Sequence, residues 1–96
     1  MPAYWIARAK INDAEAYKRY TDVAGDVVAQ YGGRFLARGG PFQILEGSDH
    51  FTRFVVAEFP TMEDAVACHS SEAYQAAAAN RKGGGGDAEI VIVEGA

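Results

Sequence analysis

The feature that most constrains this chain is a set of strand-like segments that carry apolar side chains on both faces. Successive side chains of a β-strand point to opposite sides of a sheet. Near the end of the chain, Ile90 and Ile92 therefore face one way, while Val91 and Val93 face the other. Both faces of a sheet built from such strands have to be covered, and a chain of 96 residues has little material to cover them.

The apolar periodicity changes twice from that of a strand to that of a helix. Aromatic and aliphatic residues recur every three or four positions between an N-cap at Asn12 or Asp13 and the glycine pair at 32–33, which predicts a first helix. A second helix is predicted over about 62–68, with Ser70 or Ser71 capping a further helical piece. The predicted strands are 3–9, 34–38 with an extended continuation at 42–46, 51–59 and 87–94, and glycines 83–86 form a predicted flexible linker.

This order, β-α-β-β-α-β, predicts one α+β domain over residues 1–96, with a four-stranded, mainly antiparallel sheet and helices on one face. Two helical segments cover only one face of such a sheet. The other face would expose more large apolar side chains than a monomer usually leaves in one patch. A twofold partner is the commonest closed solution, so we predict a homodimer with the sheets face to face. The alternative is that the second face stays partly exposed or lies under the glycine-rich loops.

Composition excludes several classes of protein. The net charge is −4 and the basic residues are scattered, so we expect no nucleic-acid partner. One cysteine, Cys68, excludes an internal disulfide framework and a cysteine-cluster zinc site, and two histidines without an acidic cluster predict no metal site. No apolar run approaches the roughly 20 residues that span a bilayer, and the start lacks the pattern of a signal peptide. We therefore expect a cytoplasmic protein with no membrane partner and no cofactor.

Several short motifs resemble those of one bacterial family. They are Ala-Gln-Tyr-Gly-Gly-Arg-Phe-Leu-Ala-Arg-Gly-Gly at 29–40, Leu-Glu-Gly at 45–47, Val-Ala-Glu-Phe-Pro at 56–60, Ser-Glu-Ala-Tyr-Gln at 71–75 and Ile-Val-Glu-Gly at 92–95. Together they resemble the family called domain of unknown function 1330, in register over essentially the whole chain. The resemblance implies a ferredoxin-like subunit of a dimeric α/β barrel, with a cavity between each sheet and its helices or loops. The wider superfamily includes cofactor-independent monooxygenases, lactone isomerases and haem-binding enzymes, so the fold by itself does not define an activity.

The candidate site residues are one histidine and several tyrosines. His69, near the end of the second helix, is a candidate general base, although a helix C-terminus would favour its charged form. Tyr17 and Tyr20 lie on the sheet-facing stripe of the first helix, where their hydroxyls can donate to a ligand. Tyr74 lies one heptad before Arg81, so both can face the same side if the helix continues that far. The alternatives are a half-exposed histidine and core tyrosines with no ligand.

Charged residues within strands complete the candidate site. An arginine can hold a carboxylate in a bidentate manner, and Arg34 is the predicted anion anchor. An equally weighted alternative to anion binding is that these charges form an interface salt bridge or protect an edge strand from aggregation. Arg53 and Glu58 fall on opposite faces by parity.

These candidates lead to three hypotheses about function. The first is a dimer that binds a small organic molecule, or converts it without a cofactor, in a pocket between sheet and helices. Such a site predicts a cavity above roughly 300 Å³. The second is a structural or regulatory dimer with no ligand site. The third is a haem enzyme with His69 as an axial ligand. Whether the chain is an enzyme at all stays open at this point.

Overall fold

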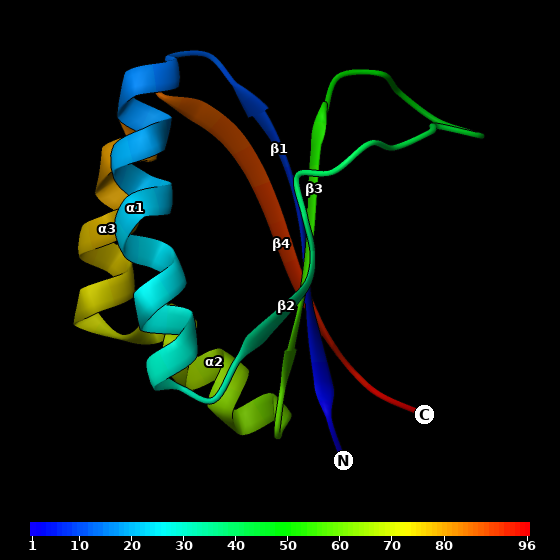
Figure 1. The fold of residues 1–96 in the computed structure, drawn as a ribbon, viewed down its shortest axis with the longest axis vertical. Helices are drawn as coiled ribbons and strands as arrows, with labels where there is room; N and C mark the ends of the chain where they lie inside the picture. Colours follow the sequence, from blue (N-terminus) through cyan, green and yellow to red (C-terminus); the bar gives the residue numbers. More distant parts are fainter.

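A four-stranded antiparallel sheet carries three helices on one of its faces in the computed structural model, which describes residues 1–96 (Figure 1). The strands lie in the order β2-β3-β1-β4, and each neighbouring pair is antiparallel. This is the predicted ferredoxin-like βαββαβ arrangement. The elements are β1 (Ala3–Ile11), α1 (Ala14–Gln30), β2 (Arg34–Arg38), β3 (Arg53–Phe59), α2 (Met62–Ser70), α3 (Glu72–Lys82) and β4 (Gly86–Glu94).

The helix ends lie close to the predicted capping residues. The Asp13 side chain accepts hydrogen bonds from two backbone amides of the first turn of α1. The helix ends at Tyr31, and Gly32 follows with φ of +84°, a conformation that glycine adopts without a steric penalty. Ser71 has extended backbone and accepts from the amide of Tyr74, so it separates α2 from α3. All three helices are too short or too polar to cross a lipid bilayer.

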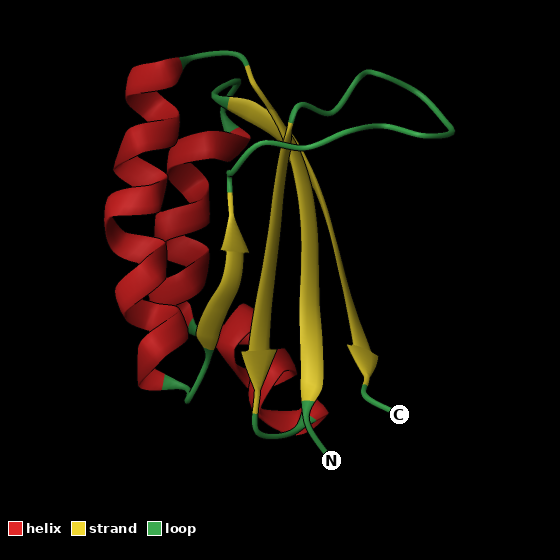
Figure 2. Ribbon diagram, turned by 45° about the vertical axis from the view of Figure 1, so that its right-hand side comes forward, coloured by secondary structure: helices red, strands yellow, loops and turns green.

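Two of the expected local conformations are wrong. Residues 42–46 form no strand but belong to a long loop, 39–52, which extends on the side of the sheet away from the helices (Figures 1 and 2). The pairing of β2 with β3 ends at Arg38, and the chain turns away at Gly39, where φ is +70°. The glycine-rich segment is not simply a linker either. Gly86 already belongs to β4, and the Gly85 carbonyl accepts hydrogen bonds from the two residues that precede α1.

A β-bulge in β2 decides which way its arginines point. Phe35 pairs with Ala57 but Ala37 pairs with Val56, so Leu36 is an extra residue in this strand. Without the bulge, Arg34 and Arg38 would lie on the same face, because they are four residues apart. The register shift places Arg34 on the face away from the helices and turns Arg38 to the face that the helices cover.

The two faces of the sheet differ in burial. We call the helix-packed side the covered face and the opposite side the open face. On the covered face, Trp5 is 4% exposed and Phe59 is fully buried within the core beneath α1, α2 and α3. On the open face, Ile6 is 41% exposed and Val91 is 59% exposed. The predicted surplus of apolar side chains is therefore present, and it lies on the face that one chain leaves bare.

Candidate functional site

A small cavity lies between the covered face and the helices, with α1 and Tyr74 of α3 on its helical side. Its volume is about 40 Å³, and its aromatic walls come from Trp5, Tyr17, Tyr20, Phe35 and Tyr74. The expected cavity above roughly 300 Å³ is therefore not present. At roughly 10–15 Å³ for each water, the space holds about three non-hydrogen atoms. The absence of a larger cavity counts against the binding hypothesis as first stated, because the space admits no more than a small head group.

A hydrogen-bonded trio lies at the side of this cavity next to α3. The hydroxyls of Tyr20 and Tyr74 are 2.6 Å apart, and an Arg81 guanidinium nitrogen donates to the Tyr74 hydroxyl at 3.4 Å. Arg81 is only 5% exposed, and its Nε atom has no hydrogen-bond partner. Its guanidinium carbon lies 4.8 Å from the centre of the Tyr20 ring, so a cation–π contact replaces part of its lost hydration. The predicted common face of Tyr74 and Arg81 is confirmed.

Tyr17 and Tyr20 are neutral near pH 7. Burial is the main cause that raises the pKa of Tyr20 well above its ordinary value, and the neighbouring Tyr74 adds to the effect. Burial and then Tyr20 raise the pKa of Tyr17 as well, despite the opposing effect of Arg53. Both residues line the cavity, as the hypothesis of a ligand site requires. In this protonated form their hydroxyls can donate to a ligand oxygen.

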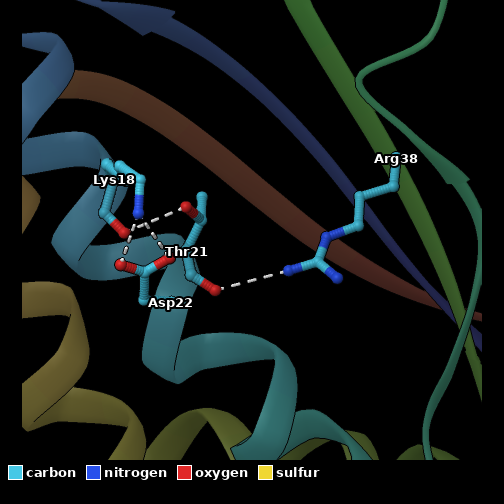
Figure 3. Close-up of polar contacts among 4 residues, drawn as sticks. All are labelled: Lys18, Thr21, Asp22 and Arg38. Carbon is cyan, nitrogen blue, oxygen red and sulfur yellow. Dashed lines mark hydrogen bonds and ion pairs between the residues drawn. The ribbon is translucent and has the colours of Figure 1, made fainter.

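Two arginines from the neighbouring strands β2 and β3 also line the cavity. Arg38 extends from the sheet to α1, where a guanidinium nitrogen lies 3.4 Å from the Thr21 carbonyl oxygen (Figure 3). Its guanidinium carbon is 4.2 Å from the centre of the Phe35 ring. Arg53 lies beside Tyr17, with its guanidinium carbon 5.8 Å from the ring centre and its buried Nε atom without a partner. Neither arginine forms an ion pair.

Arg34, the predicted anion anchor, does not join this group. Its guanidinium forms a 2.9 Å ion pair with Glu58 on the open face, the salt bridge that was the alternative interpretation. Arg38 and Arg53 lie where that anchor was expected. Strand parity places Arg53 on the same face as Val55 and Ala57, so its position on the covered face could be predicted from the sequence. The position of Arg38 could not be predicted in this way, because strand parity without the bulge assigns Arg38 to the open face.

His69 lies behind the cavity wall. Its ring packs against the rings of Trp5 and Tyr74, with centroid distances of 5.7 and 5.3 Å, but His69 does not line the cavity. Burial lowers the pKa of His69, and the positive charges of Lys82 and Arg81 lower it further. The direction is opposite to the expectation that the helix C-terminus would favour the charged imidazole.

Neither Cys68 nor an acidic group supplies a nucleophile or a base to the cavity. Cys68 is fully buried, and burial raises the pKa of its thiol to about 11. No Asp, Glu or His side chain lines the cavity. Nowhere in the chain do three or more His, Cys, Asp or Glu side chains converge as metal ligands would. The cavity therefore consists of aromatic and aliphatic walls with hydroxyl and guanidinium groups.

The open face has an apolar centre with ion pairs at its margins. Val91 of β4 lies opposite Ile6 of β1 in the register, and these two line a shallow apolar hollow with Phe54 and Val56. Ion pairs join Arg8 to Glu89 and Arg34 to Glu58 on the same face. Phe42 of the long loop packs on Phe54 with ring centroids 4.8 Å apart, so the loop covers part of this face. The distribution resembles the apolar core and polar rim of protein–protein interfaces.

These features define a class of small α+β subunits with a ferredoxin-like fold and an aromatic cavity under the helices. The model of one family, domain of unknown function 1330, matches residues 2–96, and the chain belongs to this family. No curated protein matches the sequence.

Solved structures with the same fold come from several bacteria. A protein of unknown function from Rhodopseudomonas palustris has a TM-score of 0.79 at 20% identity, over 99% of this chain and 82% of that one. SnoaB, a cofactor-independent oxygenase from Streptomyces nogalater, has a TM-score of 0.65 at 10% identity, over 99% and 93%. A dimeric ferredoxin-like protein of unknown function from Jannaschia sp. CCS1 has a TM-score of 0.64 at 14% identity, over 99% and 100%. At these identities the likeness shows the fold alone.

Proposed function

We propose that this protein is a homodimer that binds a small organic molecule with its head group in the cavity between the covered face and α1. The observation that supports this function is an aromatic cavity lined by Tyr17, Tyr20 and Tyr74 and by two arginines that form no ion pair. Pockets for small molecules combine apolar walls with a few polar groups in this way. The exposed side chain of Arg38 forms part of the lining, so a rotamer change there can admit a larger ligand.

The residues that line the cavity suit ligand binding better than acid–base catalysis, because none of them is suited to act as a general base. A general base works best with a pKa near the operating pH. Tyr17 and Tyr20 are protonated near pH 7, and His69 packs behind Trp5 and Tyr74 without lining the cavity. SnoaB is a cofactor-independent oxygenase with the same fold. In this chain, any such conversion would have to depend on the reactivity of the ligand itself, with tyrosine hydroxyls as donors.

Native mass spectrometry of protein purified from its own host tests the binding function. We expect a small molecule in addition to the mass of the polypeptide. The variant Ala88→Val adds two methyl groups at the cavity wall and should remove it, while Ala37→Val on exposed β2 should not. Two results would favour the alternative of a structural or regulatory dimer with no ligand site. These are wild-type protein that carries no small molecule, and ligand screens in which wild type and Ala88→Val give the same signal.

The homodimer is supported by the open face. Its apolar centre and marginal ion pairs suit an interface, and one protein of the same fold is described as dimeric. The loop 39–52 extends on the same side, with Leu45 87% exposed, and would contact the second copy (Figure 2). Light scattering after size exclusion should give about twice 10.3 kDa. A stable monomer at low micromolar concentration would overturn this part of the proposal.

A further inference from the structure

Both charged groups around the cavity are cationic hydrogen-bond donors, while the hydroxyls of Tyr17, Tyr20, Tyr74 and Thr21 can donate as well as accept. A ligand that satisfies the two cations must therefore bring acceptors. The lining contains two guanidinium groups, from Arg38 and Arg53, but no Asp, Glu, Asn, Gln or His side chain. A guanidinium group donates hydrogen bonds and accepts none. The Thr21 carbonyl oxygen, an acceptor near the cavity, lies 3.4 Å from Arg38.

The tyrosine pair contributes one more unused donor. Tyr20 and Tyr74 carry two hydroxyl protons, and the 2.6 Å bond between them uses one of these protons. The Arg81 guanidinium can only donate, so its bond to the Tyr74 oxygen uses neither proton. One phenolic proton is therefore left over whichever tyrosine donates within the pair. Because both tyrosines line the cavity, this proton is available to an acceptor placed there.

The arginine head groups lie against two glycines, which leave room for them. The guanidinium of Arg38 lies over Gly25 of α1, where a β-carbon would be 2.9 Å from one of its nitrogens. The guanidinium of Arg53 lies directly against Gly39, so that a β-carbon there would overlap it. Each cation is thus accommodated beside the cavity without a carboxylate partner. A guanidinium group in such surroundings gains most from a planar anion with two oxygens.

We propose that the ligand is a small organic acid whose carboxylate group occupies the cavity, paired with Arg38 and Arg53 and hydrogen-bonded by the Tyr20–Tyr74 pair. This inference rests on the proposed binding function. The cavity of about 40 Å³ suits the three non-hydrogen atoms of a carboxylate, at roughly 10–15 Å³ for each water-sized group. The remainder of the acid would extend past the exposed side chain of Arg38.

Fluorescence titration with acids and their neutral amides tests the proposal. Trp5 is the only tryptophan and lies in the cavity wall, so it reports occupancy directly. We expect acetate and benzoate to give saturable changes, with dissociation constants about tenfold or more below those of acetamide and benzamide. Control titrations with sodium chloride at the same ionic strength distinguish specific carboxylate binding from the screening of charges by salt.

Arginine variants locate the carboxylate. Arg38→Gln and Arg53→Gln should each weaken acetate binding by about tenfold or more, because a charge-assisted hydrogen bond is lost. Arg34→Gln, a matched change on the open face, should leave it unchanged. Loss of binding in Arg34→Gln alone would place the anion on the open face and overturn the proposal.

The comparison of acids with amides stands even if a variant fails to fold, since it uses the wild-type protein. Amides that bind as tightly as the acids would overturn the carboxylate proposal and leave the proposed binding function in place. If neither series binds and native mass spectrometry finds no retained molecule, both proposals fail.

Discussion

The covered face and the open face of the sheet are formed by the same strands, but only the covered face is closed within one chain. Trp5 is 4% exposed on the covered face, and its neighbour Ile6 is 41% exposed on the open face. The covered face combines a core with a cavity lined by tyrosines and two arginines, whereas the open face combines an apolar centre with ion pairs. The difference shows that alternate residues of one strand meet different surroundings, so the two proposed roles, ligand binding and dimerisation, fall on opposite faces.

The largest effect should come from deleting a core side chain on the covered face. Phe59→Ala should lower the free energy of unfolding by about 3–5 kcal/mol, because a fully buried ring leaves a cavity. Val93→Ala on the open face should cost about 0.5 kcal/mol at concentrations where the protein is monomeric. Urea denaturation measures both values. Equal losses would show that one chain already covers both faces.

A charge on the open face should separate the subunits without unfolding them. Val91→Glu should weaken the dimer at least about 100-fold, because an unpaired carboxylate would be buried at the interface. Val91 is 59% exposed in the single chain, so the monomer should retain its circular dichroism spectrum. Sedimentation analysis measures the dissociation constant. An unchanged dimer would exclude this face as the interface.

Removing one tyrosine hydroxyl should cost more stability on the covered face than on the open face. Tyr74→Phe should cost about 1–3 kcal/mol, because it leaves Arg81 and Tyr20 without a hydrogen-bond partner in a buried place. Tyr4→Phe on the open face removes a half-buried hydroxyl and should stay within about 0.5 kcal/mol of wild type. Thermal unfolding of the three proteins at one concentration gives the comparison. A neutral Tyr74→Phe would mean that water replaces the lost hydroxyl.

A substitution at Gly25 should separate stability from binding. Gly25→Ala removes a glycine from the interior of α1 and should add about 0.5–1 kcal/mol of stability. The same methyl group displaces the Arg38 guanidinium, so acetate binding should weaken while stability rises. Val23→Ala, an exposed change on the same helix, should raise stability slightly and leave binding alone. If Gly25→Ala binds acetate as tightly as wild type, Arg38 does not contribute to acetate binding.

The smallest effect concerns pH. The folded protein lowers the pKa of His69 below its ordinary value of 6.5, mainly by burial, so folding favours the neutral imidazole. The unfolded chain then binds more protons as the pH falls through 6.5, and stability decreases. His69→Gln should show a smaller decrease between pH 7.5 and 5.5, measured by urea unfolding at each pH. Equal slopes for the two proteins would show that His69 is not the group responsible.

Strand parity predicted more of the site than single motifs did. It placed Arg53 and Glu58 on opposite faces, and the spacing of Tyr74 and Arg81 placed them on one side of α3. Tyr17, Tyr20 and Tyr74 line the cavity because helical periodicity turns them toward the sheet. Arg34 and His69 were chosen by residue type, and their surroundings place them elsewhere.

The sequence by itself determined the order of elements, the helix caps and the apolar character of both sheet faces, because these depend on residues close together in the chain. Only the tertiary structure decided which arginines lie by the cavity. The bulge at Leu36 depends on how β2 pairs with a strand 15 or more residues later, and it alone turns Arg38 toward α1. The same holds for the cavity volume and the Tyr20–Tyr74 bond, which depend on packing between distant segments.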